Sequence, residues 1–313
     1  MSAFGGHLVA KVADYIGLRR SLGYVFDVQA ATLRAFVKFV MLRHDPGPLT
    51  SELALAFVLA CNVTPAVRAR RYSVLVRFAD YLAVFDTRTP VLDPRALPRS
   101  RATPPARILD DAELALLLAA ARSIDRPHVL SGETLYTVLG LLASTGLRSG
   151  EALRLDRADV DFTTGVLQIR QTKFRKDRLV PVHPSTSARL RAYTLVRDRV
   201  FPRPSSAAFF LSSRGRRLPS TSFSAAFRDA RHCAGLGTDR PRMLRPHDLR
   251  HRFATTRLVQ WYREGIDVQA QLPVLAAYLG HVRYSDTAYY ITGTPELLGL
   301  VAARAFDSGG EVQ

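Results

Sequence analysis

A proline-rich interval, residues 87–107, divides the chain and restricts most strongly how it can fold. The stretch TRTPVLDPRALPRSRATPPAR contains five prolines among several arginines. Proline lacks a backbone N–H and its ring clashes with the preceding helical turn, so no regular helix can run through this interval. The chain has 313 residues, which is long enough for two cores of ordinary size. We therefore expect a first domain over 1–86, a Pro- and Arg-rich linker over 87–107, and a second domain over 108–313.

Helical spacing dominates the first domain. Thr64 and Pro65 suit the N-cap and the first helical position of the run TPAVRARRYSVLVRFADYLAVF, in which apolar residues recur at helical spacing. Similar runs begin near Asp27 and Thr50. The pattern predicts a small, mostly helical bundle.

The second domain mixes helices with a short sheet. Asp110 and Glu113 form a variant of the capping box before the apolar run ELALLLAAAR, which predicts a helix start. Residues 165–170 and 178–182 are short β-type segments, and the basic stretch between them is predicted to be the turn of a hairpin. Further helices are expected at 135–144, after Arg148, at 222–236, at 248–265, and in a C-terminal run capped by Thr294 and Pro295. The predicted fold class is mainly α with a small β-sheet (α+β).

Positive charge is spread over both expected domains. Lys and Arg number 44 against 27 Asp and Glu, which gives a formal net charge of +17. The basic excess is eight residues in 1–107 and nine in 108–313. This balance is typical of a protein that binds a polyanion, and nucleic acid is a better candidate than an anionic membrane surface. Three arginines of the first domain are candidate DNA contacts, with a solvated arginine-rich surface as the alternative: Arg68, Arg70 and Arg71.

Several other classes of protein do not fit the sequence. No stretch approaches the roughly 18 apolar residues of a membrane-spanning helix. The first residues, MSAFGGHLVAKVADY, have neither the charged start nor the apolar run of a signal peptide. Cys61 and Cys233 are too isolated for a disulfide framework or a thiolate metal site, and we expect both to be packing residues. The expected location is the cytoplasm.

Several side chains of the second domain are candidates for binding an anion. His247 and Arg250 are three residues apart, so on a helix they share one face and both can donate to one anion. Arg148 lies between glycines, and its guanidinium matches phosphate oxygens. His281 follows, with tyrosines soon after it. Such donors and a tyrosine could bind a phosphodiester, stabilise its pentavalent transition state and attack it. Taken singly, each of these residues is more typical of a surface, capping or core position.

The order of these residues resembles the tyrosine recombinase (phage integrase) family. TGLRSGEALRL is similar to the family's first arginine motif, HDLRHRFAT to its second, and LGH followed nine residues later by tyrosine to its third. The resemblance extends over about 109–306, and the first domain resembles the family's core-binding domain in character and position. WYREGIDVQAQLPVLAAYLGH and ITGTPELL resemble transposon-borne recombinases more than Xer-type resolvases.

The resemblance implies a role for each matching residue. Those that hold and neutralise the scissile phosphate would be Arg148, His247, Arg250 and His281. Tyr290 would be the nucleophile that forms a 3′-phosphotyrosyl bond, with no metal, ATP or other cofactor. Tyr284 and Tyr289 are expected to be packing residues or DNA contacts. We expect Glu151 to orient Arg148 rather than to react.

The predicted hairpin turn contains two of the chain's four lysines, although the other forty basic residues are arginines. The leaving 5′-oxygen needs a proton, and arginine has too high a pKa to release one. In the family a lysine of this turn is the general acid, and Lys173 is the better match to it. Lys176 is expected to contact backbone phosphate. The alternative for both is a solvent-exposed turn.

Two alternatives to an active recombinase come from other classes. One is a catalytically inactive accessory DNA-binding protein of the same fold. The other is a zinc hydrolase that uses the i, i+4 pair of His247 and His251, with His281 or an acidic residue as third ligand. An arginine beside the metal argues against it. For the recombinase, the expected partner is double-stranded DNA, with a tetramer on paired sites and companion recombinases.

Overall fold

The computed structural model describes residues 3–98, 106–123, 129–170, 177–237 and 243–281, together with Thr287, Tyr290, Leu297 and Gly299. The chain folds into two compact units, Met1–Thr103 and Pro104–Gln313. Each unit has its own hydrophobic core. No helix in the described ranges is long and apolar enough to span a membrane.

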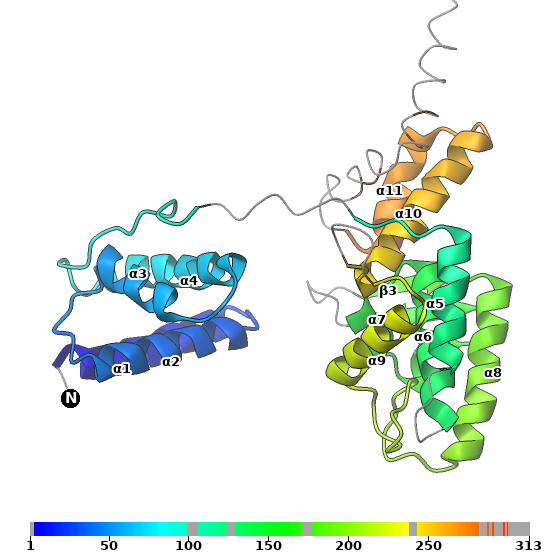
Figure 1. Cartoon of the computed structure of the whole chain (residues 1–313), viewed down its shortest axis with the longest axis horizontal. Coiled ribbons are helices and arrows are strands. Elements are labelled where there is room, and N and C mark those ends of the chain that lie inside the picture. The colour runs from blue at the N-terminus through cyan, green and yellow to red at the C-terminus, as the bar shows by residue number, and fades with distance from the viewer. Residues whose placement is uncertain are drawn as a thin grey trace, which may run out of the picture. The chain divides into compact units, whose positions relative to one another are not determined.

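The first unit is helical. Its elements are α1 (Ala3–Ser21), α2 (Asp27–Leu42), α3 (Ser51–Ala60) and α4 (Pro65–Ala83) (Figure 1). The predicted starts near Asp27 and Thr50 and at Pro65 are confirmed. The side chain of Thr50 accepts a hydrogen bond from the backbone of Leu53 at 3.2 Å, whereas Thr64 precedes α4 without a side-chain bond of this kind.

Helix α1 was not predicted, because its glycines lower helix propensity and weaken the amphipathic pattern. Packing compensates for this. Leu8, Val12 and Ile16 are buried in the core of the first unit, and the ring of Tyr15 contacts that of Phe26 edge-on at 5.7 Å. Tertiary burial therefore outweighs a weak local preference.

The second unit is mainly helical, as predicted. Its helices are α5 (Asp111–Ser123), α6 (Val129–Thr145), α7 (Ser149–Arg154), α8 (Pro184–Val200), α9 (Ser220–Cys233), α10 (Pro246–Arg263) and α11 (Val268–Leu279). The predicted capping box is present: the Glu113 backbone donates to Asp110 at 2.7 Å, and the Asp110 backbone donates to Glu113 at 3.2 Å. Of the C-terminal run after Thr294, the structure describes Leu297 and Gly299, which are helical, and Leu297 is buried.

Two helices of this unit, α8 and α11, were missed by sequence reasoning. Few residues of α8 are apolar, and Leu190 and Tyr193 hold it in the core. Helix α11 contains Pro273, which normally argues against a helix interior. Its buried leucines, Leu272, Leu275 and Leu279, stabilise it against Ala254 and Leu258 of α10 in a separate small core.

The sheet is small and antiparallel, in the order β1 (Val160–Asp161), β2 (Val166–Ile169) and β3 (Arg178–Pro181). The two predicted strands are confirmed as a pair, with Ile169 opposite Arg178. Strand β1 was too short to be predicted. Residues 171–176, which include Lys173 and Lys176, lie outside the described ranges.

The two cysteines differ from each other. Cys61 is partly buried against the core of the first unit, as expected. Cys233, at the end of α9, is exposed, so the expectation that it packs in a core is wrong. It occupies the last position of an amphipathic helix, whose buried face is formed by Phe223, Phe227 and Ala230.

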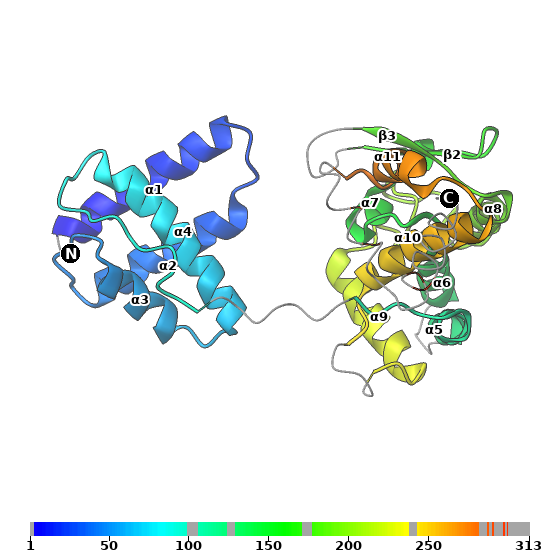
Figure 2. The same cartoon turned by 90° about the horizontal axis from the view of Figure 1, so that it is seen from above.

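The start of β3 packs against the end of α11, as Figure 2 shows. Gly280 ends α11 in a left-handed conformation, with φ of 70°. A Cβ at this position would lie 2.8 Å from the Arg178 guanidinium. Arg178 has little freedom to move away, because its side chain donates to the carbonyl of Tyr278 at 3.0 Å and to Glu151. Glycine is required here both by backbone conformation and by close approach.

We predict that Gly280→Ala destabilises the second unit more than Gly265→Ala. Gly265 also has positive φ, 73°, but a Cβ there would meet no described atom within 4 Å. Both variants lose about 1–2 kcal/mol to left-handed strain. Gly280→Ala should lose roughly 1–3 kcal/mol more, because it displaces charged hydrogen bonds of Arg178. Urea denaturation followed by fluorescence of Trp261, the only tryptophan of the chain, measures both. Equal losses would contradict the prediction.

Candidate active site

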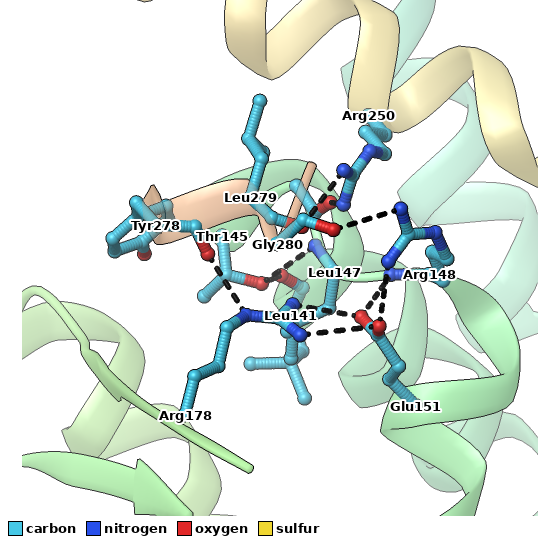
Figure 3. Close-up of polar contacts among 11 residues, drawn as sticks. Leu141, Thr145, Leu147, Arg148, Glu151, Arg178, Arg250, Tyr278, Leu279 and Gly280 are labelled. Atoms are coloured by element: carbon cyan, nitrogen blue, oxygen red, sulfur yellow. Dashed lines mark hydrogen bonds and ion pairs between the residues drawn. The ribbon is translucent and has the colours of Figure 1, made fainter. Parts of the chain in front are cut away.

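The carboxylate of Glu151 lies between two arginines from distant parts of the chain (Figure 3). It accepts hydrogen bonds from Arg148 Nη1 at 2.9 Å and from Arg178 Nη1 and Nη2 at 3.2 and 2.9 Å. The backbone N–H of Arg148 donates to it as well, at 3.0 Å. Glu151 is only 3% exposed. This residue therefore joins the start of α7, where Arg148 is the N-cap, to the start of β3.

Glu151 remains ionised at any physiological pH. Burial by itself raises the pKa of this carboxyl, but the hydrogen bonds and charge of Arg178, followed by the hydrogen bonds from Arg148, lower the pKa to about 2. A group with such a low pKa holds no proton to transfer near neutrality. Glu151 therefore orients Arg148, as expected from the sequence, and cancels only one of the two positive charges beside it.

Arg250 is fixed by backbone carbonyls. Its Nη1 donates to the carbonyl of Gly146 and its Nη2 to that of Leu279, both at 2.8 Å. Arg148 Nη2 donates to the carbonyl of the next residue, Gly280, at 3.2 Å (Figure 3). The turns after α6 and α11 thus hold both guanidinium groups, and the left-handed glycines of those turns, Gly146 and Gly280, set the direction of the carbonyls.

Arg250 is charged at neutral pH even though it is only 1% exposed. Burial lowers the pKa of its guanidinium to about 10; the charge of Tyr290 and a hydrogen bond with it raise that pKa, whereas Arg148 lowers it. The Nε atom of Arg250 is buried and has no hydrogen-bond partner in the described part of the chain. A buried cationic donor without a partner is costly, and an anionic oxygen would satisfy it.

Tyr290 lies among imidazole rings and is 3% exposed. The His281 ring stacks on its ring, with centroids 5.8 Å apart and planes at 18°. The His251 ring meets it edge-on at 5.3 Å, and His247 meets His251 edge-on at 4.9 Å. His281 Nδ1 lies 2.6 Å from the hydroxyl of Thr287, which is fully buried. A tyrosine, guanidinium groups and imidazoles therefore gather at one place.

The structure brings together five of the residues singled out in the sequence: Arg148, His247, Arg250, His281 and Tyr290. The sequence-predicted acid, Lys173, and its neighbour Lys176 lie outside the described ranges. The candidate DNA contacts of the first unit lie on α4, where Arg70 is exposed and Arg68 and Arg71 are partly buried. Arg68 Nη2 donates to the carbonyl of Cys61 at 3.4 Å.

Two residues of the site were not assigned to it from the sequence. Arg178 is separated from Glu151 by 27 positions, and no local pattern pairs the two. His251 was considered only as a zinc ligand, although its i, i+4 spacing from His247 already indicated a shared helix face.

The described residues contain no group of three or more His, Cys, Asp or Glu side chains that could hold a metal ion. The pair of His247 and His251 therefore has no third zinc ligand among the described residues.

We predict that Glu151→Gln destabilises the second unit in a pH-dependent way. The folded-state pKa of Glu151 is about 2, below its ordinary value of 4.5. The ionised carboxylate therefore stabilises the fold above pH 4.5, and this contribution is lost as the pH falls toward about 2. At neutral pH the variant should lose on the order of 3 kcal/mol of unfolding free energy.

Urea denaturation of both proteins across this pH range, followed by Trp261 fluorescence, measures the difference. The gap between wild type and variant should close on acidification. A gap that stays constant down to pH about 3 would contradict the assigned ionisation.

Comparison with known proteins agrees with this geometry. Residues 107–296 match the model of the phage integrase family. The chain is 55% identical over 310 residues to the putative integrase/recombinase y4rE of Sinorhizobium fredii, covering 99% of both chains. It is 36% identical over 275 residues to the tyrosine recombinase XerD of Mycobacterium tuberculosis, covering 86% of this chain and 80% of that relative.

Solved structures share the fold. The Tn1549 transposon integrase in complex with transposon right end DNA superposes with a TM-score of 0.67 at 16% identity, covering 96% of this chain and 99% of that one. The XerH site-specific recombinase bound to palindromic difH substrate has a TM-score of 0.65 at 18% identity, covering 88% and 78%. At these identities the superpositions concern the fold alone, and the family follows from the sequence matches. The chain belongs to the phage integrase family and is a tyrosine site-specific recombinase.

Proposed function

We propose that this recombinase cleaves and rejoins DNA strands through a 3′-phosphotyrosyl intermediate at Tyr290. The observation that carries the proposal is the burial of Tyr290 against the rings of His251 and His281, beside the fixed guanidinium of Arg250. The phenolic oxygen must lose its proton to attack phosphorus. A guanidinium beside that oxygen stabilises the phenolate that must attack phosphorus.

The two arginines would bind the scissile phosphate. Arg148 has 29% of its side chain exposed, so an anion can reach it from solvent. Arg250 offers its buried Nε donor on the inner side. Charge on the nonbridging oxygens rises in the pentavalent transition state, and donors that are already oriented stabilise it without reorganisation. His247 and His281 are proposed to complete this set.

The reaction would exchange one ester for another. The Tyr290 oxygen forms a bond to phosphorus as the bond to the 5′-oxygen breaks, and the leaving oxygen takes a proton. We propose Lys173 as the donor of that proton, from its position in the sequence. A 5′-hydroxyl of a second strand can then attack the phosphotyrosyl bond and regenerate Tyr290, so the cycle needs neither ATP nor a metal ion.

The substrate is proposed to be double-stranded DNA. The solved Tn1549 integrase structure contains transposon right end DNA, and the basic excess of this chain is shared by both units. Phosphate contacts should make binding fall steeply with salt. We propose four such contacts: Arg68, Arg70, Arg71 and Lys176. A tetramer on paired sites, with companion recombinases, would act in the cytoplasm in integration, excision or transposition.

We predict that Tyr290→Phe abolishes the covalent complex while leaving DNA binding intact, because phenylalanine keeps the ring but has no nucleophilic oxygen. The full-length protein first selects its binding site from a random duplex library. A nicked suicide duplex with that site then traps the adduct, which denaturing electrophoresis detects. An adduct with Tyr290→Phe would refute the assignment of Tyr290, and DNA binding without any wild-type adduct would instead favour an inactive accessory protein.

We predict that Lys173→Arg slows cleavage by roughly 100-fold or more, because arginine keeps the charge but does not release a proton. Lys176→Arg is the matched control and should cleave like wild type, since a phosphate contact needs only charge. A substrate with a 5′-bridging phosphorothiolate has a better leaving group and should restore cleavage by Lys173→Arg. Absence of this rescue would move the acid role to another residue.

A further inference from the structure

Three aromatic side chains form a row from the surface to the nucleophile. His247 is exposed, His251 is partly buried and Tyr290 is 3% exposed. The centroid distances along the row are 4.9 Å from His247 to His251 and 5.3 Å from His251 to Tyr290. Both histidines lie on α10, one helical turn apart. This row connects the buried Tyr290 ring to a solvent-exposed imidazole through side chains that can exchange protons.

The proton of Tyr290 needs an acceptor when the tyrosine attacks. Arg250 contacts Tyr290 but is a donor only, and it stays charged at neutral pH. His281 stacks on the Tyr290 ring, and its Nδ1 lies 2.6 Å from the Thr287 hydroxyl, which orients the imidazole. Imidazole is the one side chain that accepts and releases protons readily near neutral pH. Of the two imidazoles packed on Tyr290, that of His251 also leads to an exposed histidine.

We infer that His251 accepts the phenolic proton of Tyr290 during strand cleavage and passes it to His247 and solvent. The inference rests on the proposed function and adds a residue to it. The O–H bond of Tyr290 breaks as its oxygen bonds to phosphorus, and the proton moves to a ring nitrogen of His251. The bond from phosphorus to the 5′-oxygen breaks, and that oxygen takes its proton from the general acid. Rejoining reverses each transfer, so no net proton is consumed.

The surrounding charges favour outward transfer. His251 contacts the rings of His247, on the same helix, and of Tyr290. Tyr290 in turn stacks on His281 and interacts with the Arg250 guanidinium, which Arg148 affects by its charge. An imidazolium among these cations is disfavoured by like charge, although ionised Glu151 offsets one of them. A proton on His251 is therefore released toward exposed His247. At low pH His251 is protonated before the reaction, so cleavage should lose its acceptor.

The test uses full-length protein and the nicked suicide duplex with the selected site, with single-turnover formation of the covalent complex as the readout. His251→Phe keeps a ring against Tyr290 but cannot accept a proton, and His251→Ala leaves space for an added imidazole. We expect both variants to bind DNA like wild type and to cleave roughly 100-fold or more slowly. Wild-type cleavage should fall on acidification, when the acceptor is already protonated, and this acid limb should be absent in His251→Phe.

Chemical rescue separates proton transfer from packing. Imidazole and methylated imidazoles should accelerate His251→Ala but not His251→Phe, with rates that rise with the pKa of the added base. The inference is overturned if His251→Phe cleaves within about threefold of wild type, or if rescue of His251→Ala does not depend on that pKa. A wild-type protein that forms no covalent complex would overturn the proposed function itself, and the inference with it.

Discussion

The site depends on one buried carboxylate. Glu151 joins the start of α7 to the start of β3 through Arg148 and Arg178, and Arg178 reaches the end of α11 through the carbonyl of Tyr278. An unpaired ionised group at this depth would cost several kcal/mol, so the fold is stable only when these segments meet in this arrangement. The ion pairs do not need to be strongly stabilising in net terms to have this effect. They raise the free energy of arrangements in which Glu151 is buried without its arginine partners, and thereby give Arg148 a single orientation.

Backbone carbonyls, in addition to Glu151, fix the orientation of the guanidinium groups of the site. The carbonyls of Gly146, Leu279 and Gly280 accept hydrogen bonds from Arg250 and Arg148, and all three lie in turns that left-handed glycines shape. A carbonyl cancels no net charge, so the guanidinium groups are oriented but stay fully cationic. That combination suits recognition of an anion whose charge increases during a reaction, because the positive potential exists before the substrate arrives.

The choice of basic side chain follows the chemistry that each position needs. Arginine suits the positions where charge and a fixed fork geometry are required, and here its guanidinium nitrogens are held by several acceptors at once. Proton transfer requires groups of lower pKa, and we propose His251 and His247 of α10 and Lys173, between β2 and β3 in the sequence, for this role. Under this proposal the arginines serve binding, and Lys173, one of only four lysines among the 44 Lys and Arg residues, serves proton transfer.

The sequence by itself determined the mainly helical class with its two paired strands, the helix starts at Pro65 and after Asp110, and the motif residues Arg148, Arg250 and Tyr290. These follow from patterns that lie within a few residues of one another. The tertiary structure alone decided the pairing of Glu151 with Arg178 and the packing of His251 on Tyr290, as well as the helical state of α11 despite Pro273. Those outcomes depend on contacts between distant segments, where burial outweighs local propensity and no short-range pattern encodes the partner.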